Sequence, residues 1–466
     1  MLLAVQQVAA PDPQVGLWAL VKIACVFAVM VLLVRRKMPI GYVLLIASVL
    51  LGLALGVGFA ATAEPGIGWA LRGTWGLVVA IVTFALEVDS LRLLCLVLTI
   101  TVFGAVMKHV EKLQELTDSL LALLRDRRWA MASLASLIGL LPMPGGAMVS
   151  APMVGEVARD LDLTREQKTA INHWMRHIWE YIDPLYPALL MASAVFAVPV
   201  TNLMLAHSPL TLAAIAGGVL FLLRRVPRHQ RQVGDEAGAR SLGPVVRAIM
   251  PVLAVVVAAM VPQALSLLAK GVPGLDLPGG ERWVDKNFVR WLTETSMLVA
   301  LFGVIVYLML GARVRRAEAW GLVRQGVTLR MTALVLSVCV MKGVLEASGT
   351  VEPIAAFLRS TGLPTPVVVG SLLFIVGMLL GYSFGFVAIC YPMLLPMLQT
   401  AEGAVNYPMA AFAFAMGFLG VLLSPVHLCL VLSREHFDAG WGGVYRHLLA
   451  PSALVFATAC FMLFWA

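Results

Sequence analysis

The chain has 466 residues, of which 60% are hydrophobic and 13% are charged, and its mean hydropathy is +0.90. Soluble domains carry about twice that charged fraction, so the composition excludes a soluble protein and predicts an all-α, multi-pass membrane protein. The formal net charge of +8 does not require a nucleic-acid partner, because Lys and Arg concentrate in the cytoplasmic loops of membrane proteins.

Ten segments are long and apolar enough to cross a bilayer. They are 17–34, 39–60, 90–107, 172–198, 208–223, 244–268, 291–312, 330–347, 408–432 and 446–465. The block 66–86 contains Arg72 and two tryptophans, which favours a helix lying along the interface. If this block spans instead, the topology after it is inverted. With ten spans and both termini outside, most of the 34 Lys and Arg lie on the cytoplasmic side of the cell inner (cytoplasmic) membrane.

Two further apolar blocks, 129–157 and 366–398, are interrupted at their centres. The first carries two prolines and two glycines within the five residues 142–146. Such residues break a helix, because proline lacks an N–H and glycine has too much freedom. Broken backbone is tolerated in a membrane only where protein or water surrounds it. We therefore expect a re-entrant hairpin in each block; for the first, a kinked transmembrane helix is the alternative.

The two halves of the chain resemble each other, with short strings that recur in the same order at slowly growing offsets. The matched strings are Val106-Met107-Lys108 with Val340-Met341-Lys342, Gly139-Leu140-Leu141-Pro142 with Gly377-Met378-Leu379-Leu380-Gly381, Ala151-Pro152-Met153 with Tyr391-Pro392-Met393, and Pro184 with Pro425. Each half has five spans, and an odd number makes the repeat inverted, as in secondary transporters. The expected organisation is an N-terminal repeat over 1–223, a basic cytoplasmic linker over 224–243 and a C-terminal repeat over 244–466.

The most polar stretch inside any expected span covers residues 172–187. Asn172, Arg176, Glu180 and Pro184 follow one another in steps of four residues, on one helical face, with Asp183 close to it. Charges inside a span cost at least about 2.5 kcal/mol each, so they normally face a cavity or a partner. The alternative interpretation is a structural Arg176–Glu180 pair that ties helices together.

Metal and nucleotide sites are not expected from the motifs. His173 and His177 have the i, i+4 spacing of metal ligands on one helix, but their motif offers no third ligand. The six cysteines are scattered singly without C-x-x-C spacing, which indicates buried thiols. No GxxxxGK[ST] motif is present. We therefore expect no metal and no cofactor, apart from Na⁺ or H⁺ as a coupling ion.

Two hairpin tips that meet near the midplane would direct helix N-termini and free N–H groups at one cavity, which favours an anion. Arg176 adds a planar fork that is suited to a carboxylate. The expected substrate-binding residues are Pro144, Gly145, Gly146, Ser150, Asn172, Arg176, Gly381, Ser383, Gly385 and Ser424. Proton or ion coupling is assigned to Glu180, Asp183 and His427. Alternatively, carbonyls freed at the broken helices would coordinate sodium.

Three strings of the sequence carry a resemblance: LLPMPGGAMVSAPMV, NHWMRHIWEY and GVLLSPVHLCLVLSREHF. They resemble an uncharacterised domain-of-unknown-function family of integral membrane proteins, which is placed with the ion transporter (IT) superfamily of gluconate, C4-dicarboxylate and citrate permeases. The resemblance covers nearly the whole chain. It implies two inverted repeats with re-entrant hairpins, commonly in homodimers that move a transport domain against a scaffold. It implies no substrate, and the Ser-Asn-Thr hairpin signature of the sodium–dicarboxylate members is absent.

Together these features predict a secondary active transporter, a symporter of a small organic anion with alternating access between the hairpin tips. The expected partners are this anion, the lipid bilayer and a second copy in a homodimer, with no nucleic acid. The alternatives are an intramembrane acid–base enzyme that uses Glu180, Asp183 and the histidines, and a passive anion channel. An enzyme is not expected, because an inverted repeat suits two alternating faces.

Overall fold

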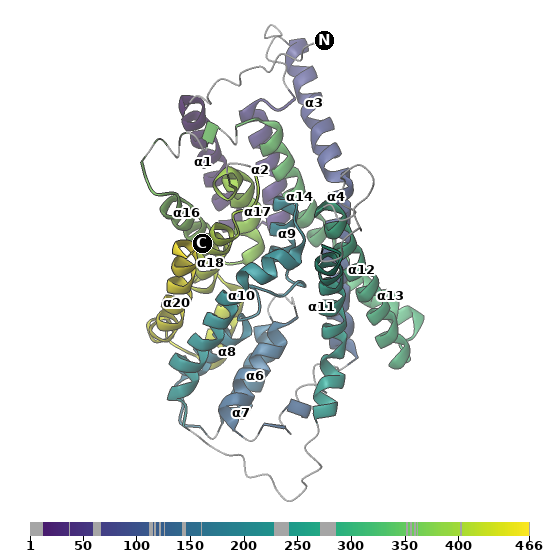
Figure 1. Ribbon diagram of the computed structural model, residues 1–466, viewed down its shortest axis with the longest axis vertical. Coiled ribbons are helices and arrows are strands. Elements are labelled where there is room, and N and C mark those ends of the chain that lie inside the picture. Colours follow the sequence, from purple (N-terminus) through teal and green to yellow (C-terminus); the bar gives the residue numbers. More distant parts are fainter. Residues whose placement is uncertain are drawn as a thin grey trace, which may run out of the picture. The chain divides into compact units, whose positions relative to one another are not determined.

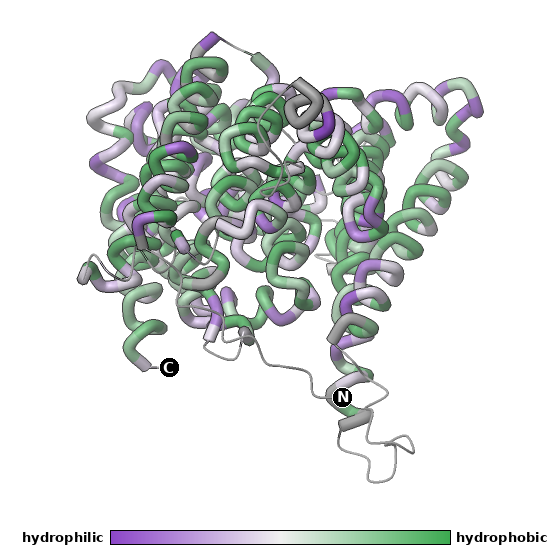
Figure 2. The backbone as a smooth tube through the Cα atoms, turned by 90° about the horizontal axis from the view of Figure 1, so that it is seen from above, coloured by the Kyte–Doolittle hydropathy of each residue, from purple (hydrophilic) through white to green (hydrophobic). Residues whose placement is uncertain are grey.

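The elements of the computed structural model are helices over the residues that it describes, and an isolated antiparallel bridge joins Gln399 to Val405 (Figure 1). Figure 2 shows long hydrophobic stretches along these helices. The described residues are 13–36, 38–58, 67–110, 115, 118–120, 123–124, 126–141, 146–159, 161–227, 242–270, 286–350, 353–354, 357, 360, 362–400 and 403–465.

Contacts within the chain define two compact units, each of which takes segments from both halves of the sequence. Unit 1 comprises Met1–Leu94, Leu329–Leu372 and Ala388–Asn406, and unit 2 comprises Cys95–Thr328, Leu373–Val387 and Tyr407–Ala466. These units are interleaved along the chain, whereas the division at 224–243 expected from the repeat is sequential. Every candidate site residue that the structure describes belongs to unit 2.

Unit 1 is built around the packing of α14 along α2, with α1 on α2 and α3 on α14. Its complete helices are α1 (Pro13–Arg35), α2 (Ile40–Leu55), α3 (Ile67–Leu86) and α14 (Leu329–Ala347). A Cβ on Gly41 would lie 2.6 Å from the backbone N of Leu334, so this glycine permits the close approach of α2 and α14. The block with Arg72 forms the single helix α3, and its position relative to a bilayer stays a prediction.

Unit 2 contains the long apolar helices and several short ones. Its helices are α6 (Arg127–Gly139), α7 (Ala147–Val157), α8 (Arg165–Arg176), α9 (Pro187–Phe196), α10 (Val200–Gly217), α11 (Leu242–Lys270), α12 (Lys286–Gly311), α13 (Arg316–Gly326), α18 (Tyr407–Leu422), α19 (Leu428–Phe437) and α20 (Trp441–Phe464). Helices α4 (Val88–His109), α16 (Thr365–Leu380) and α17 (Ser383–Leu394) contribute to both units. Helices α6, α7 and α8 pack against one another, and α19 and α20 both contact α8.

Five helical segments among the described residues are long and apolar enough to cross a membrane, or six if α13 and α14 count as one span. They are Val88–His109, Val200–Arg225, Gly243–Ser266, Phe288–Gly311 and Trp441–Phe464. The prediction of a multi-pass, all-helical membrane protein is therefore confirmed. The total of ten spans stays a prediction, since several other apolar helices are shorter.

Two expected spans are not continuous helices. Within the segment 172–198, helix α8 ends at Arg176 and the next helix, α9, begins at Pro187. Pro184 and Pro187 lack the N–H that a helix requires, and the Leu185 N–H donates to Asp183 Oδ1 at 2.9 Å instead. The prediction of one helical face running from Asn172 through Glu180 to Pro184 is therefore wrong.

The segment 408–432 is broken in the same way. Helix α18 ends at Leu422 and α19 begins at Leu428, with Pro425 in the gap. The Val426 N–H donates to Ser424 Oγ at 3.3 Å, so a side-chain turn replaces a turn of helix. The repeated Pro184 and Pro425 thus lie in corresponding gaps of the two halves.

Both apolar blocks with central interruptions are interrupted in the structure. In the first block, α6 and α7 contact each other on either side of a gap that contains Gly146. In the second, α16 ends at Leu380 and α17 begins at Ser383, and Gly381 has a φ of +67°. The predicted tip residues Pro144 and Gly145 lie outside the described residues. A re-entrant path through the membrane stays a prediction for both blocks.

Helix α8 begins in a polar environment that fixes its N-terminus. Thr164 and Gln167 form a capping box, which satisfies N–H groups at the start of the helix. Glu166 accepts a hydrogen bond from the Gly440 N–H at 3.1 Å, and this amide holds the pKa of the Glu166 carboxyl below its usual value. The Glu166–Gly440 contact attaches the start of α8 to the turn between α19 and α20.

Candidate functional site

Four gaps between helices lie together in unit 2. They are the gaps between α6 and α7, between α8 and α9, between α16 and α17, and between α18 and α19. The Tyr186 hydroxyl donates to the Gly139 carbonyl at 2.6 Å, which joins the first two gaps. His427 Nδ1 donates to the Gly381 carbonyl at 2.6 Å, and His427 Nε2 lies 3.1 Å from His177 Nε2. Hydrogen bonds therefore link described residues at the edges of all four interruptions.

Arg176 is the last residue of α8, directly before one of these gaps, and is only 2% exposed. Its Nη1 donates to Cys429 Sγ at 3.0 Å and lies 3.5 Å from His177 Nε2. A Cβ on Gly146 would collide with the guanidinium. The absence of a side chain at Gly146 therefore makes room for Arg176 beside the start of α7.

Glu180 lies in the gap between α8 and α9 and is 6% exposed. Its Oε2 accepts a hydrogen bond from Ser383 Oγ at 3.2 Å, and its Oε1 lies 3.6 Å from His177 Nε2. The structure thus brings the predicted residues Glu180 and Ser383 together from opposite halves of the sequence. A buried carboxylate and a buried guanidinium within one polar cluster are the charges that a membrane protein normally keeps for a functional site.

Several predicted residues bond to the protein itself. Asn172 Nδ2 donates to Ser433 Oγ at 2.8 Å, which ties α8 to α19. Ser424 Oγ donates to the Met378 carbonyl at 2.6 Å. A Cβ on Gly385 would lie 2.7 Å from Tyr382 Cε1, so this glycine accommodates the tyrosine ring. These three positions therefore organise the gaps through protein contacts.

Other buried polar atoms lack a hydrogen-bond partner within the described part of the chain. Ser150 Oγ on α7, Asp183 Oδ2 and the Tyr382 hydroxyl are in this class, and all belong to segments that border the gaps. A buried polar atom without a partner costs about 1–3 kcal/mol, so such atoms cluster where a protein binds something polar. Ser150 and Asp183 were predicted as site residues; Tyr382 was not.

The sequence analysis also missed Cys429 and the clustering of His173 and His177 with His427. Cys429 was interpreted as an ordinary buried thiol, yet it contacts the guanidinium of Arg176. His173 and His177 were set aside for want of a third ligand, and His427 supplies a third imidazole from the other half. The repeat offered a signal, since it aligns the gap of 177–186 with the gap that contains His427.

Replacing Gly139 with alanine should destabilise the protein. A Cβ at this position would collide with the Arg176 carbonyl, which belongs to rigid backbone, so α6 and α8 would have to separate. Overpacking of this kind costs about 1–3 kcal/mol, and the thermal unfolding temperature should fall. The matched control is Gly303→Ala on α12, where nothing lies within 4 Å of the new Cβ and the unfolding temperature should stay the same or rise. Equal temperatures for both variants would contradict the tight contact.

Comparisons with known proteins show a family and a solved structure that this chain resembles. A model of the DUF401 family, described as proteins of unknown function, matches residues 19–269 and 289–464. No curated protein matches the chain. One matching solved structure is the crystal structure of the Alcanivorax borkumensis YdaH transporter, which is described as revealing an unusual topology. The TM-score is 0.55 at 17% sequence identity, and the match covers 91% of this chain and 97% of that chain. At this identity the likeness shows a shared fold.

Proposed function

The chain belongs to the DUF401 family, and from this premise and the site geometry we propose that it is a secondary active transporter of a small organic anion. The observation that carries the proposal is the buried Arg176 where four helix gaps meet. A guanidinium binds a carboxylate through two parallel hydrogen bonds. Discontinuous helices supply free backbone groups to substrates and coupling ions in secondary transporters. The fold shared with a transporter supports the same conclusion.

In this proposal the anion lies against Arg176 and the start of α7, within reach of Gly146 and Ser150. The N-terminus of α7 adds N–H groups and the positive end of its dipole, and both favour a negative ligand. The buried Ser150 hydroxyl, which has no partner among the described residues, would donate to the bound carboxylate. Ser383 and Glu180 close the other side of the site.

Coupling by a proton is assigned first to Asp183 and then to Glu180 and His427. Asp183 is 4% exposed, and its Oδ2 has no hydrogen-bond partner among the described residues. A carboxylate that is buried in this way gains from taking up a proton when the transporter changes state. Sodium held by the carbonyls of the gaps is the alternative coupling ion. The proposal also includes membership of the ion transporter superfamily, two re-entrant hairpins and a homodimer in the inner membrane.

A thermal-shift screen of organic acids on the purified protein, with and without sodium, tests the proposal. A ligand at 100 times its Kd should raise the free energy of unfolding by about 2.7 kcal/mol. We expect small carboxylates to raise the unfolding temperature, and an effect of sodium on that shift would identify the coupling ion. Reconstituted vesicles should then show saturable uptake of the same acid.

The alternative functions would give different results in these assays. Chemical conversion of the acid by the protein in detergent would identify an enzyme, and ion currents without saturation or coupling would identify a channel. A screen in which no organic acid changes the unfolding temperature would overturn the assignment of an organic anion. Inorganic anions, included as a parallel set, would then be the next class to test.

A further inference from the structure

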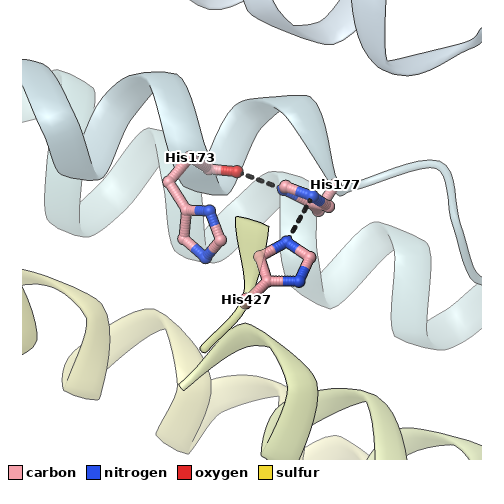
Figure 3. A group of neighbouring side chains, drawn as sticks. All are labelled: His173, His177 and His427. Carbon is pink, nitrogen blue, oxygen red and sulfur yellow. Dashed lines mark hydrogen bonds between the residues drawn. The ribbon is translucent and has the colours of Figure 1, made fainter. Parts of the chain in front are cut away.

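Three buried histidines form a cluster that the transport proposal uses only in part. His173 and His177 lie at the C-terminal end of α8, and His427 lies in the gap before α19. One ring nitrogen of each residue lies within 4.8 Å of the others. The three side chains are 0%, 1% and 7% exposed, respectively. Figure 3 shows His427 below the two rings of α8, with its Nε2 directed at His177.

Each ring is oriented by a backbone carbonyl. His177 Nδ1 lies 2.6 Å from the His173 carbonyl, His427 Nδ1 lies 2.6 Å from the Gly381 carbonyl, and His173 Nε2 lies 3.0 Å from the Leu422 carbonyl. A carbonyl oxygen only accepts, so each of these ring nitrogens carries the proton. The lone pairs are therefore on His173 Nδ1, His177 Nε2 and His427 Nε2. A ring N–H bonded to a carbonyl is the arrangement that fixes the tautomer of metal-binding histidines.

The three lone pairs lie close to one another. His177 Nε2 and His427 Nε2 are only 3.1 Å apart, so their lone pairs repel each other, and the Arg176 Nη1 donor that faces His177 Nε2 lies at the long distance of 3.5 Å. A shared proton would relieve this pair but would leave the third nitrogen, His173 Nδ1, which is buried without a hydrogen-bond partner in the described part of the chain. One metal ion would satisfy all three nitrogens.

We propose that His173, His177 and His427 bind one divalent transition-metal ion of the zinc class. Imidazole nitrogen is a ligand that Zn²⁺, Ni²⁺ and Cu²⁺ accept readily. Zn–N bonds of about 2.0–2.1 Å place tetrahedral ligand atoms roughly 3.3 Å apart, close to the 3.1 Å between His177 and His427. The ring nitrogens that are farthest apart, at up to 4.8 Å, must approach each other by roughly 1.5 Å to reach the tetrahedral spacing. Rotation of a ring can bring them that much closer.

Glu180 supplies the fourth ligand. Its Oε1 lies 3.6 Å from His177 Nε2, near the tetrahedral spacing, while Ser383 Oγ holds Oε2 at 3.2 Å. The carboxylate also contributes one of the two negative charges that would balance a buried divalent cation. Arg176 Nη1 has a long 3.5 Å contact to His177 Nε2, which the metal would replace, and a shorter 3.0 Å contact to Cys429 Sγ.

Metal binding and protonation of His427 exclude each other, because they use the same nitrogen. Metal binding is a property separate from the proposed transport function. Its test does not depend on uptake of any anion. Asp183 lies outside the proposed ligand set, so it remains free to carry a proton whether or not the metal is bound.

Direct metal titration of the full-length protein tests the site. The protein, purified with a histidine-free tag and stripped by a chelator, is titrated with Co²⁺. We expect one Co²⁺ per chain, with the visible spectrum of a four-coordinate ion, and displacement by Zn²⁺. His173→Ala and His427→Ala should each weaken binding by more than the 10–100-fold that is typical when a partner of a ligand is lost. His436→Ala, which removes an exposed histidine of α19, is the matched control and should bind as the wild type does.

Glu180→Gln keeps the three imidazoles and should retain Co²⁺ with an altered spectrum. Wild-type protein that gives no four-coordinate Co²⁺ spectrum would overturn the proposal, whether or not the histidine variants fold. Equal loss of binding in His436→Ala and His427→Ala would also overturn it, since binding would then arise from the surface. A wild type that takes up no metal, with a proton shared between His177 and His427, is the alternative occupancy of the cluster.

Discussion

Replacing Arg176 with glutamine should abolish binding of the organic anion. The change removes the buried positive charge beside Gly146 and Cys429. Truncating one partner of a buried, hydrogen-bonded charge pair typically costs about 2–5 kcal/mol, which is a loss of roughly 30-fold to more than 1,000-fold in affinity. The measurement is the ligand-induced thermal shift, followed by uptake into vesicles. Arg165→Gln, at the exposed start of the same helix, is the matched control and should bind normally.

Two related variants separate recognition from structural pairing. Arg176→Lys keeps the charge but loses the planar fork, so affinity should fall sharply while some uptake remains. Glu180→Gln keeps an acceptor for Ser383, so a substrate role predicts folded protein with altered affinity, whereas a purely structural role predicts loss of folded protein. If Arg176→Gln bound the anion as tightly as the wild type, the site would have to consist of backbone amides alone.

Replacing Gly146 with leucine should eliminate uptake while leaving most of the protein folded. A side chain at Gly146 meets the guanidinium of Arg176, so it displaces the anion-recognising group and fills the start of α7. The displaced arginine has a long, flexible side chain, so the cost falls mainly on the site. Loss of saturable uptake, with expression and elution volume unchanged, is the expected result.

Gly442→Leu provides the control for this variant. Gly442 lies in the first turn of α20 with nothing within 4 Å of a new Cβ, so the same substitution there should leave uptake unchanged. Wild-type uptake by Gly146→Leu would show that Arg176 and the start of α7 need not stay in contact. The block 129–157 would then be better described as a kinked helix with no role at its interruption.

The class of protein and the places where helices break follow from local features of the sequence. Composition alone requires a membrane, because so apolar a chain has no soluble alternative. The interruption at 142–146 follows from its prolines and glycines. The same residue type marks the breaks at Pro184 and Pro425, although the apolar length of 172–198 and 408–432 predicts continuous spans.

The tertiary structure alone decided which side chains meet in the site. His177 and His427 are 250 positions apart, and Arg176 and Cys429 are 253 positions apart. Spacing along one helix relates only neighbours within a few turns, so it could not find the third imidazole or the thiol. The assignment of Asn172 to a ligand stays a prediction; the structure adds that its Nδ2 donates to Ser433 Oγ, while its Oδ1 has no hydrogen-bond partner among the described residues. The sequence by itself therefore determined the membrane class, the polar stretch and the helix-breaking residues; packing between distant gaps determined the composition of the site.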